Sequence, residues 1–237
     1  MQLLLPEEPD ELAALKQEFF DNGRCSVQPI LPEEDAERLA NWLETTDGWA
    51  RIRGLRKQRF DIPPGTDLAG DPQLAEDHRQ IDRAIAGDAS KSFAFLYDGI
   101  PMTPEALAAM PDNPLCELRS AMTDMRVYQW LQDLSEEPKL SAVEIQATRF
   151  TLGDFLSTHH DGPNEDRKIA AVLGLSRDWS VDWGGNLLFL CGEDGLQGLV
   201  PGFNRLDLFA VPQFHCVSPV APSAPRPRHA ISGWFLA

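Results

Sequence analysis

The part of the chain beyond Pro138 constrains the fold most, because its character changes there to short β-like runs. Clusters of Gly, Asp, Asn and Pro, which favour turns, separate these runs. Short strands that follow one another without intervening helices are typical of β-sandwiches and jelly rolls. Residues 139–237 are therefore predicted to form a β-sheet core of this kind.

The first 138 residues carry apolar residues mainly at helical spacing. Helices are predicted over residues 9–21, 32–46, 71–86 and 117–134, the last of them long and buried. Strands are predicted over residues 23–31 and over 91–97, where Phe93, Phe95 and Tyr97 alternate. A length of 237 residues suits one domain. We expect a single α+β domain, in which helices and an edge strand of residues 1–138 support the core.

The composition excludes several functional classes. No apolar run is long enough to span a membrane, and the N-terminus lacks the pattern of a signal peptide. The four cysteines are scattered without paired spacing, which fits a reducing compartment. A net charge of −16 argues against a direct grip on nucleic acid, which needs Lys and Arg. We expect a cytoplasmic protein that binds neither nucleic acid nor membrane directly.

The sequence His159-His160-Asp161 is the strongest functional motif. In a strand, residues two apart point to the same face, so His159 and Asp161 can bind one metal while His160 points away. His215, in a later apolar run, is the best placed third ligand. Two imidazoles and one carboxylate suit non-haem Fe(II) and leave open positions for other ligands. Any single histidine is more often structural than a ligand, and it is the spacing that favours a metal site.

Arg228 begins a terminal strand-like run in which Arg228, Ala230 and Ser232 share one face. A guanidinium makes a bidentate pair with a carboxylate, and Ser232 could add a hydroxyl donor. The face could therefore bind an anionic co-substrate. The plainer alternative is a surface ion pair, which contributes only about 0 to 1 kcal/mol.

These features resemble the Fe(II)- and 2-oxoglutarate-dependent dioxygenases, and among them the prolyl 4-hydroxylase-like branch. The resemblance covers residues 141–237 in order. It includes segments 149–156, 159–161, 167–179, 183–189, 200–209, 215–217 and 228–235. It implies a double-stranded β-helix (jelly roll) core with Fe(II) bound by His159, Asp161 and His215. It also implies 2-oxoglutarate as co-substrate, with its distal carboxylate on Arg228. Whether ascorbate is needed stays open.

Two positions depart from that branch. Phe150 stands where a tyrosine is common, and Gly174 stands near another tyrosine position. A missing hydrogen bond of roughly 1 kcal/mol net would weaken co-substrate binding without abolishing it. Gly174 is also expected to enlarge the pocket.

The activity implied by the resemblance is hydroxylation of a C–H bond, with release of succinate and CO2. A prolyl residue in a protein or peptide is the first expected substrate. A free amino acid or small metabolite, a catalytically silent metal-binding sensor and a cupin-like protein that uses no oxo-acid remain alternatives. The sequence leaves the oligomeric state open.

Overall fold

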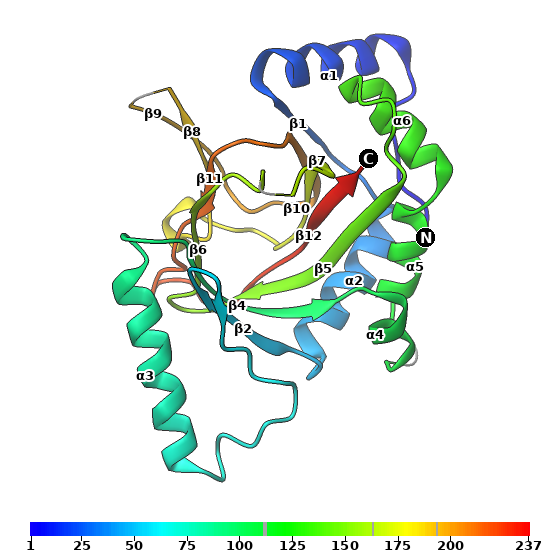
Figure 1. Ribbon diagram of the computed structural model, residues 1–237. Helices are drawn as coiled ribbons and strands as arrows, with labels where there is room; N and C mark the ends of the chain where they lie inside the picture. Colours follow the sequence, from blue (N-terminus) through cyan, green and yellow to red (C-terminus); the bar gives the residue numbers. More distant parts are fainter. Residues whose placement is uncertain (111–112, 163, 193) are drawn as a thin grey trace.

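The computed structural model describes residues 1–110, 113–162, 164–192 and 194–237, and its centre is a curled antiparallel sheet (Figure 1). Ten strands follow one path in the order β1-β10-β7-β12-β5-β4-β6-β11-β8-β9, and β2 and β3 join beside β4. The strands are β1 (Arg24–Val27), β2 (Ala50–Leu55), β3 (Gln58–Arg59), β4 (Ala94–Pro101), β5 (Ala142–Phe150), β6 (Phe155–His159), β7 (Arg167–Leu175), β8 (Leu187–Cys191), β9 (Gly195–Leu199), β10 (Phe203–Ala210), β11 (His215–Val217) and β12 (Arg228–Leu236). The α+β jelly-roll prediction is confirmed.

Helices pack mainly against one side of this sheet. They are α1 (Pro9–Asn22), α2 (Glu33–Thr45), α3 (Pro72–Asp88), α4 (Pro104–Ala108), α5 (Leu115–Met122) and α6 (Met125–Ser135). In Figure 1, α3 lies apart from the other helices. Its Ile85 packs with Ala94 and Leu96 of β4 in a separate small core. Within the described part of the chain, no helix combines the length and apolar character that a bilayer crossing requires.

The prediction of one long helix over residues 117–134 is wrong, because the chain forms two helices there. α5 ends at Met122, and the Asp124 side chain then accepts a hydrogen bond from the Arg126 backbone N–H at 2.8 Å. An aspartate N-cap of this kind starts a new helix. The helical spacing of apolar residues therefore continued across the turn that separates the two helices.

The N-terminal part supplies more of the sheet than the predicted edge strand. β1 pairs with β10, and β4 pairs with both β5 and β6. β2 and β3 had no counterpart in the sequence prediction. The two parts of the chain therefore share one sheet, which supports the proposal that residues 1–237 form a single domain.

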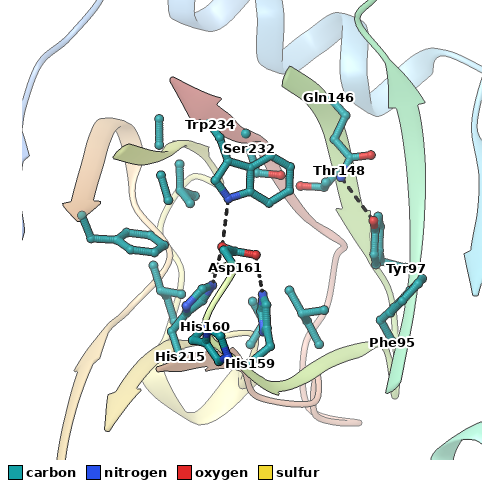
Figure 2. A pocket seen from close by; sticks show the side chains of 18 of the residues that line it. Phe95, Tyr97, Gln146, Thr148, His159, His160, Asp161, His215, Ser232 and Trp234 are labelled. Atoms are coloured by element: carbon teal, nitrogen blue, oxygen red, sulfur yellow. Dashed lines mark hydrogen bonds and ion pairs between the residues drawn. The ribbon is translucent and has the colours of Figure 1, made fainter. Parts of the chain in front are cut away.

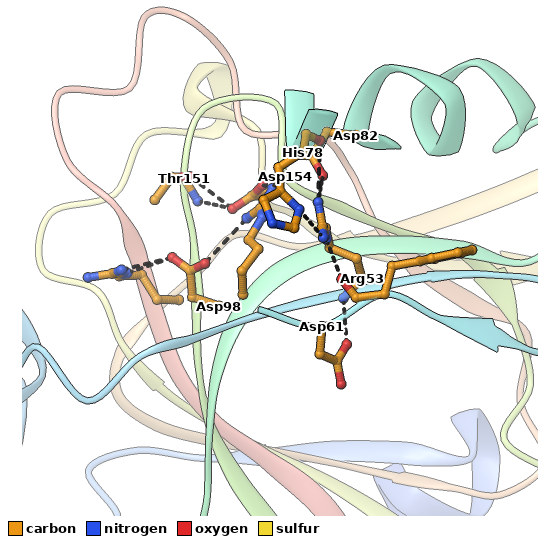
Figure 3. A network of polar contacts seen from close by, with 10 residues as sticks. Arg53, Asp61, His78, Asp82, Asp98, Thr151 and Asp154 are labelled. Atoms are coloured by element: carbon orange, nitrogen blue, oxygen red, sulfur yellow. Dashed lines mark hydrogen bonds and ion pairs between the residues drawn. The ribbon is translucent and has the colours of Figure 1, made fainter. Parts of the chain in front are cut away.

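β2 was not predicted from the sequence, because its charged residues Arg51 and Arg53 interrupt the apolar pattern of a strand. Arg51 pairs with Asp154 at 2.6 Å, and Arg53, only 1% exposed, pairs with Asp82 at 3.0 Å (Figure 3). Arg53 also lies 2.8 Å from Nδ1 of His78. These contacts satisfy cations inside the fold. His78 is half-buried within this network.

Candidate metal centre and anion pocket

One pocket of about 760 Å³ opens into the curled sheet and receives side chains from β4, β5, β6, β7, β11 and β12. At one end of it lie His159, Asp161 and His215 (Figure 2). His159 is the last residue of β6 and His215 the first of β11, and the two are directly paired across these strands. The sheet register therefore brings together two residues that are far apart in the sequence.

The three side chains have the spacing of a metal site. One potential ligand atom from each lies within 4.8 Å of the others. Asp161 Oδ1 is 3.3 Å from His159 Nε2, and Asp161 Oδ2 is 3.5 Å from His215 Nε2. The structure thus gathers the three predicted ligands, and two imidazoles with one carboxylate are a donor set that suits Fe(II).

The route by which Asp161 reaches this cluster differs from the strand alternation predicted. β6 ends at His159, and Asp161 has a φ of +58°, in the left-handed region. Asp is among the residues that tolerate this region best. The carboxylate therefore meets the two imidazoles through a turn and not along a continuous strand.

Backbone carbonyls orient both imidazoles. Nδ1 of His159 is 2.9 Å from the Ser157 carbonyl oxygen, and Nδ1 of His215 is 2.8 Å from that of Gln213. A carbonyl only accepts, so each Nδ1 carries the proton and each Nε2 keeps its lone pair toward the cluster. Burial lowers the pKa of His215 to about 4, which keeps its ring neutral near pH 7. The His215 ring is thus prepared as a neutral ligand, and both rings are oriented with Nε2 toward the cluster.

The Asp161 carboxyl is ionised in this setting. Burial by itself raises its pKa, but its contacts with His159, His215 and the Trp234 N–H more than offset this effect. The pKa of Asp161 therefore lies below its ordinary value. An ionised carboxylate is the form that binds a metal cation.

His160 does not point away from the site as predicted. It lines the pocket, and its ring meets that of Phe214 edge-on at 5.0 Å between centroids. Its Nδ1 accepts a hydrogen bond from the Gly162 backbone N–H at 3.1 Å. His160 is therefore a wall residue beside the metal-ligand cluster. His229 stacks on Trp49 and does not line this pocket.

Arg228 supplies a positive charge to the wall of the same pocket. Arg228 is 5% exposed; within the described residues its side chain makes no hydrogen bond or ion pair, and its guanidinium carbon lies 5.1 Å from the Phe150 ring centroid. Burial lowers its pKa to about 10, so it remains a cation near pH 7. A buried guanidinium without a partner is costly unless an anion joins it. The residues present therefore fit a carboxylate ligand at this end of the pocket.

Gly185 makes room for Arg228. It has a φ of +64°, and a Cβ there would lie 3.0 Å from Cδ of Arg228. A side chain at this position would therefore press on the guanidinium stem.

Ser232 lines the pocket as predicted, and the alternation of β12 adds Trp234. Sequence reasoning missed Gln146 and Thr148, which face the pocket from β5. Gln146 donates a hydrogen bond to the Tyr97 hydroxyl at 3.2 Å. The alternation of residues 146, 148 and 150 along one strand was the signal that could have revealed them.

Phe150 and Gly174, the two positions that depart from the prolyl 4-hydroxylase-like branch, have different consequences for the pocket. Phe150 does line the pocket and stacks under Tyr97 with centroids 5.3 Å apart. Gly174 does not enlarge the pocket, and that expectation is wrong. A Cβ on Gly174 would lie 2.5 Å from the Gly202 carbonyl oxygen, so the neighbouring backbone fills this space.

Sequence and structure comparisons agree with this geometry. Residues 145–236 match the sequence model of the 2OG-Fe(II) oxygenase superfamily. The chain is 35% identical over 115 residues to prolyl 3-hydroxylase OGFOD1 of Xenopus laevis and 33% identical over 114 residues to that of Mus musculus. Each match covers 45% of this chain but only about a fifth of the relative, 22% and 21% respectively.

Solved structures share the fold over nearly the whole chain. A prolyl-4-hydroxylase from Pseudomonas putida has a TM-score of 0.58 at 18% identity, covering 95% of this chain and 98% of its own. A Trichoplax adhaerens prolyl hydroxylase, solved with a hypoxia inducible factor peptide fragment, has a TM-score of 0.61 at 16% identity, covering 97% and 94%. Residues 145–236 are therefore similar to the 2OG-Fe(II) oxygenase superfamily, whose name states the use of 2-oxoglutarate and Fe(II), and the chain has the fold of solved prolyl hydroxylases.

Proposed function

We propose that this protein is a dioxygenase that hydroxylates a prolyl C–H bond in a protein or peptide and converts 2-oxoglutarate to succinate and CO2. One observation carries the proposal more than any other. The His159, Asp161 and His215 cluster shares its pocket with Arg228, a buried cation whose side chain has no hydrogen bond or ion pair among the described residues. A metal-binding end and an anion-binding end in one cavity suit a dicarboxylate co-substrate.

Each polar residue has a defined task in this proposal. His159, Asp161 and His215 bind Fe(II), and the two backbone carbonyls keep both Nε2 atoms available. Arg228 binds the distal carboxylate of 2-oxoglutarate, and Ser232 adds a hydroxyl donor on the same wall. When bound, Fe(II) and 2-oxoglutarate supply the activation of dioxygen, which amino-acid side chains cannot perform.

The apolar walls of the pocket exclude water and orient the substrate. Phe95, Tyr97 and Phe150 line the pocket as adjacent rings, and Phe93 and Phe214 are exposed aromatics that line it as well. Such walls exclude water and offer flat apolar faces to a pyrrolidine ring. The relatives' names support a prolyl substrate, because the curated matches are prolyl 3-hydroxylases and one structural neighbour was solved with a peptide.

The first test is an anaerobic titration of the Fe(II)-loaded protein with 2-oxoglutarate, followed in the visible charge-transfer region. A new band in the wild type, absent in Arg228→Met at the same Fe(II) occupancy, is the expected result. Absence of the band in metal-loaded wild type would favour a cupin-like or silent sensor module.

The second test asks about the substrate. Succinate formation in air is measured with prolyl peptides and with free amino acids, and His159→Ala serves as the inactive control. Stimulation by prolyl peptides is expected. Stimulation only by a free amino acid would leave the dioxygenase proposal standing and replace the substrate.

A further inference from the structure

We propose that Trp234 and Arg167 are positioning residues that hold the Asp161 carboxylate in its metal-binding orientation. The inference rests on the function proposed above, because it concerns the same metal site. It adds two residues to which neither the sequence patterns nor the comparisons gave a role.

The first contact is direct. The Trp234 indole Nε1–H donates a hydrogen bond to Asp161 Oδ2 at 2.9 Å (Figure 2). Hydrogen bonds to ionised acceptors are stronger than neutral ones and restrict the rotation of the carboxylate. Both carboxylate oxygens face an imidazole, since Oδ1 lies 3.3 Å from His159 Nε2 and Oδ2 lies 3.5 Å from His215 Nε2. The indole therefore fixes the rotation of the carboxylate relative to the two imidazoles.

The second contact holds the indole. The guanidinium carbon of Arg167 lies 3.5 Å from the Trp234 ring centroid, well within the range of a cation–π interaction. Nη1 of the same arginine is 3.9 Å from Asp161 Oδ1, which adds a weak charge interaction. Arg167 thus contacts both the indole and the carboxylate that the indole orients.

Strand register explains why these side chains meet. Trp234 on β12 pairs with Glu144 on β5 and with Ala170 on β7. Arg167 reaches across this row and donates from Nη2 to Glu144 Oε2 at 3.2 Å. The indole is therefore supported by residues from the strands on both sides of β12. Asp161 gains this support although it sits in a turn, outside any strand.

This support matters because the Asp161 backbone gives little rigidity of its own. Asp161 lies two residues beyond the end of β6 and has a left-handed φ of +58°. Partners of this kind typically raise metal affinity by about 10- to 100-fold, since they fix a ligand before the metal arrives. Apart from the two imidazoles, Trp234 and Arg167 are the groups among the described residues whose contacts with the carboxylate can do so.

The test measures Mn²⁺ binding to the full chain by electron paramagnetic resonance, without co-substrate and without turnover. Trp234→Phe keeps an aromatic ring beside Arg167 but is smaller and lacks the indole N–H. We expect about 10-fold weaker Mn²⁺ binding and an altered spectrum of the bound ion. Trp42→Phe is the matched control, since Trp42 lies on α2, and it should bind Mn²⁺ as the wild type does.

The outcomes separate the two proposals. Wild-type Mn²⁺ affinity and spectrum in a folded Trp234→Phe protein would overturn the positioning role while leaving the metal site intact. If the wild type binds Mn²⁺ no better than His159→Ala does, the proposed function and this inference both fail. Should Trp234→Phe not fold, Arg167→Leu decides, with weaker Mn²⁺ binding supporting the positioning role and unchanged binding contradicting it.

Discussion

His159 and His215 are register partners across the β6–β11 pair, and their ring centroids lie 4.1 Å apart. The proposed metal site is therefore built on a strand pairing, and Asp161 completes it from the adjoining turn. Rigid strands hold the imidazoles, whereas side-chain contacts must hold the carboxylate.

Replacing His159 by alanine should abolish metal binding. In the wild type, Mn²⁺ at 100 times its Kd should stabilise the fold by about 2.7 kcal/mol, because a ligand that binds only the folded state shifts the unfolding equilibrium. His159→Ala should show no metal-dependent rise in Tm. His160→Ala is the control, because His160 lies outside the three-residue cluster and should retain the rise. An equal rise in all three proteins would contradict the ligand assignment.

Replacing Arg228 by methionine should separate co-substrate binding from stability. The variant should lose 2-oxoglutarate binding, measured by calorimetry on the Mn²⁺-loaded protein, because this buried cation is the proposed anion-binding group. Its Tm without co-substrate should be equal to or above that of the wild type, since an unpaired buried charge is replaced by an apolar chain. A large fall in Tm with retained 2-oxoglutarate affinity would make Arg228 a structural residue instead.

Gly185→Ala should weaken 2-oxoglutarate binding by displacing Arg228, because the new Cβ would lie 3.0 Å from its Cδ. Gly153→Ala is a matched control, since Gly153 also has a positive φ but a Cβ added there would meet nothing within 4 Å. Both variants should lose roughly 1 to 2 kcal/mol of stability from backbone strain. Only Gly185→Ala should lose co-substrate affinity. Equal affinities in the two variants would show that Arg228 adapts.

Acidification should destabilise the fold partly through His229. Burial, together with the charges of Arg149, Arg177 and Arg228, lowers its pKa to about 4, whereas an unfolded histidine has a pKa of about 6.5. Between these values the unfolded chain binds more protons. The contribution of His229 to the free energy of unfolding is therefore complete above pH 6.5 and is lost as the pH falls toward 4.

His229→Phe tests this, because phenylalanine can keep the stacking on Trp49 and does not titrate. The free energy of unfolding, measured with a chemical denaturant, should fall between pH 7.5 and pH 4 by roughly 3 kcal/mol less in the variant than in the wild type. His215, whose pKa burial also lowers to about 4, should leave part of the acid dependence in place. Identical pH dependence in the two proteins would assign the effect to other groups.

The structure also explains where sequence reasoning succeeded. Strand alternation predicted that Arg228 and Ser232 share a face, and both line the pocket. The same alternation placed Phe93, Phe95 and Tyr97 together, and these rings form part of the pocket wall. Local periodicity suffices in such cases, because side-chain direction in a strand follows from backbone geometry alone.

Contacts between residues that are distant in the sequence could not be predicted from local periodicity. β2 went unpredicted because Arg51 and Arg53 interrupt its apolar pattern, and their acidic partners come from α3, β4 and the β5–β6 turn. The expectation for Gly174 was wrong because the Gly202 backbone that packs against it is distant in sequence. Burial of such groups depends on partners that no local window contains.

The sequence by itself determined the donor set, His159, Asp161 and His215, and the jelly-roll character of the C-terminal part, because residue chemistry and period-two alternation are local properties. Only the tertiary structure decided that Asp161 joins the site through a left-handed turn, and that Trp234 and Arg167 brace it. The physical reason is register. The pairing of β12 with β5 and β7, set by packing of the whole sheet, determines which side chains meet.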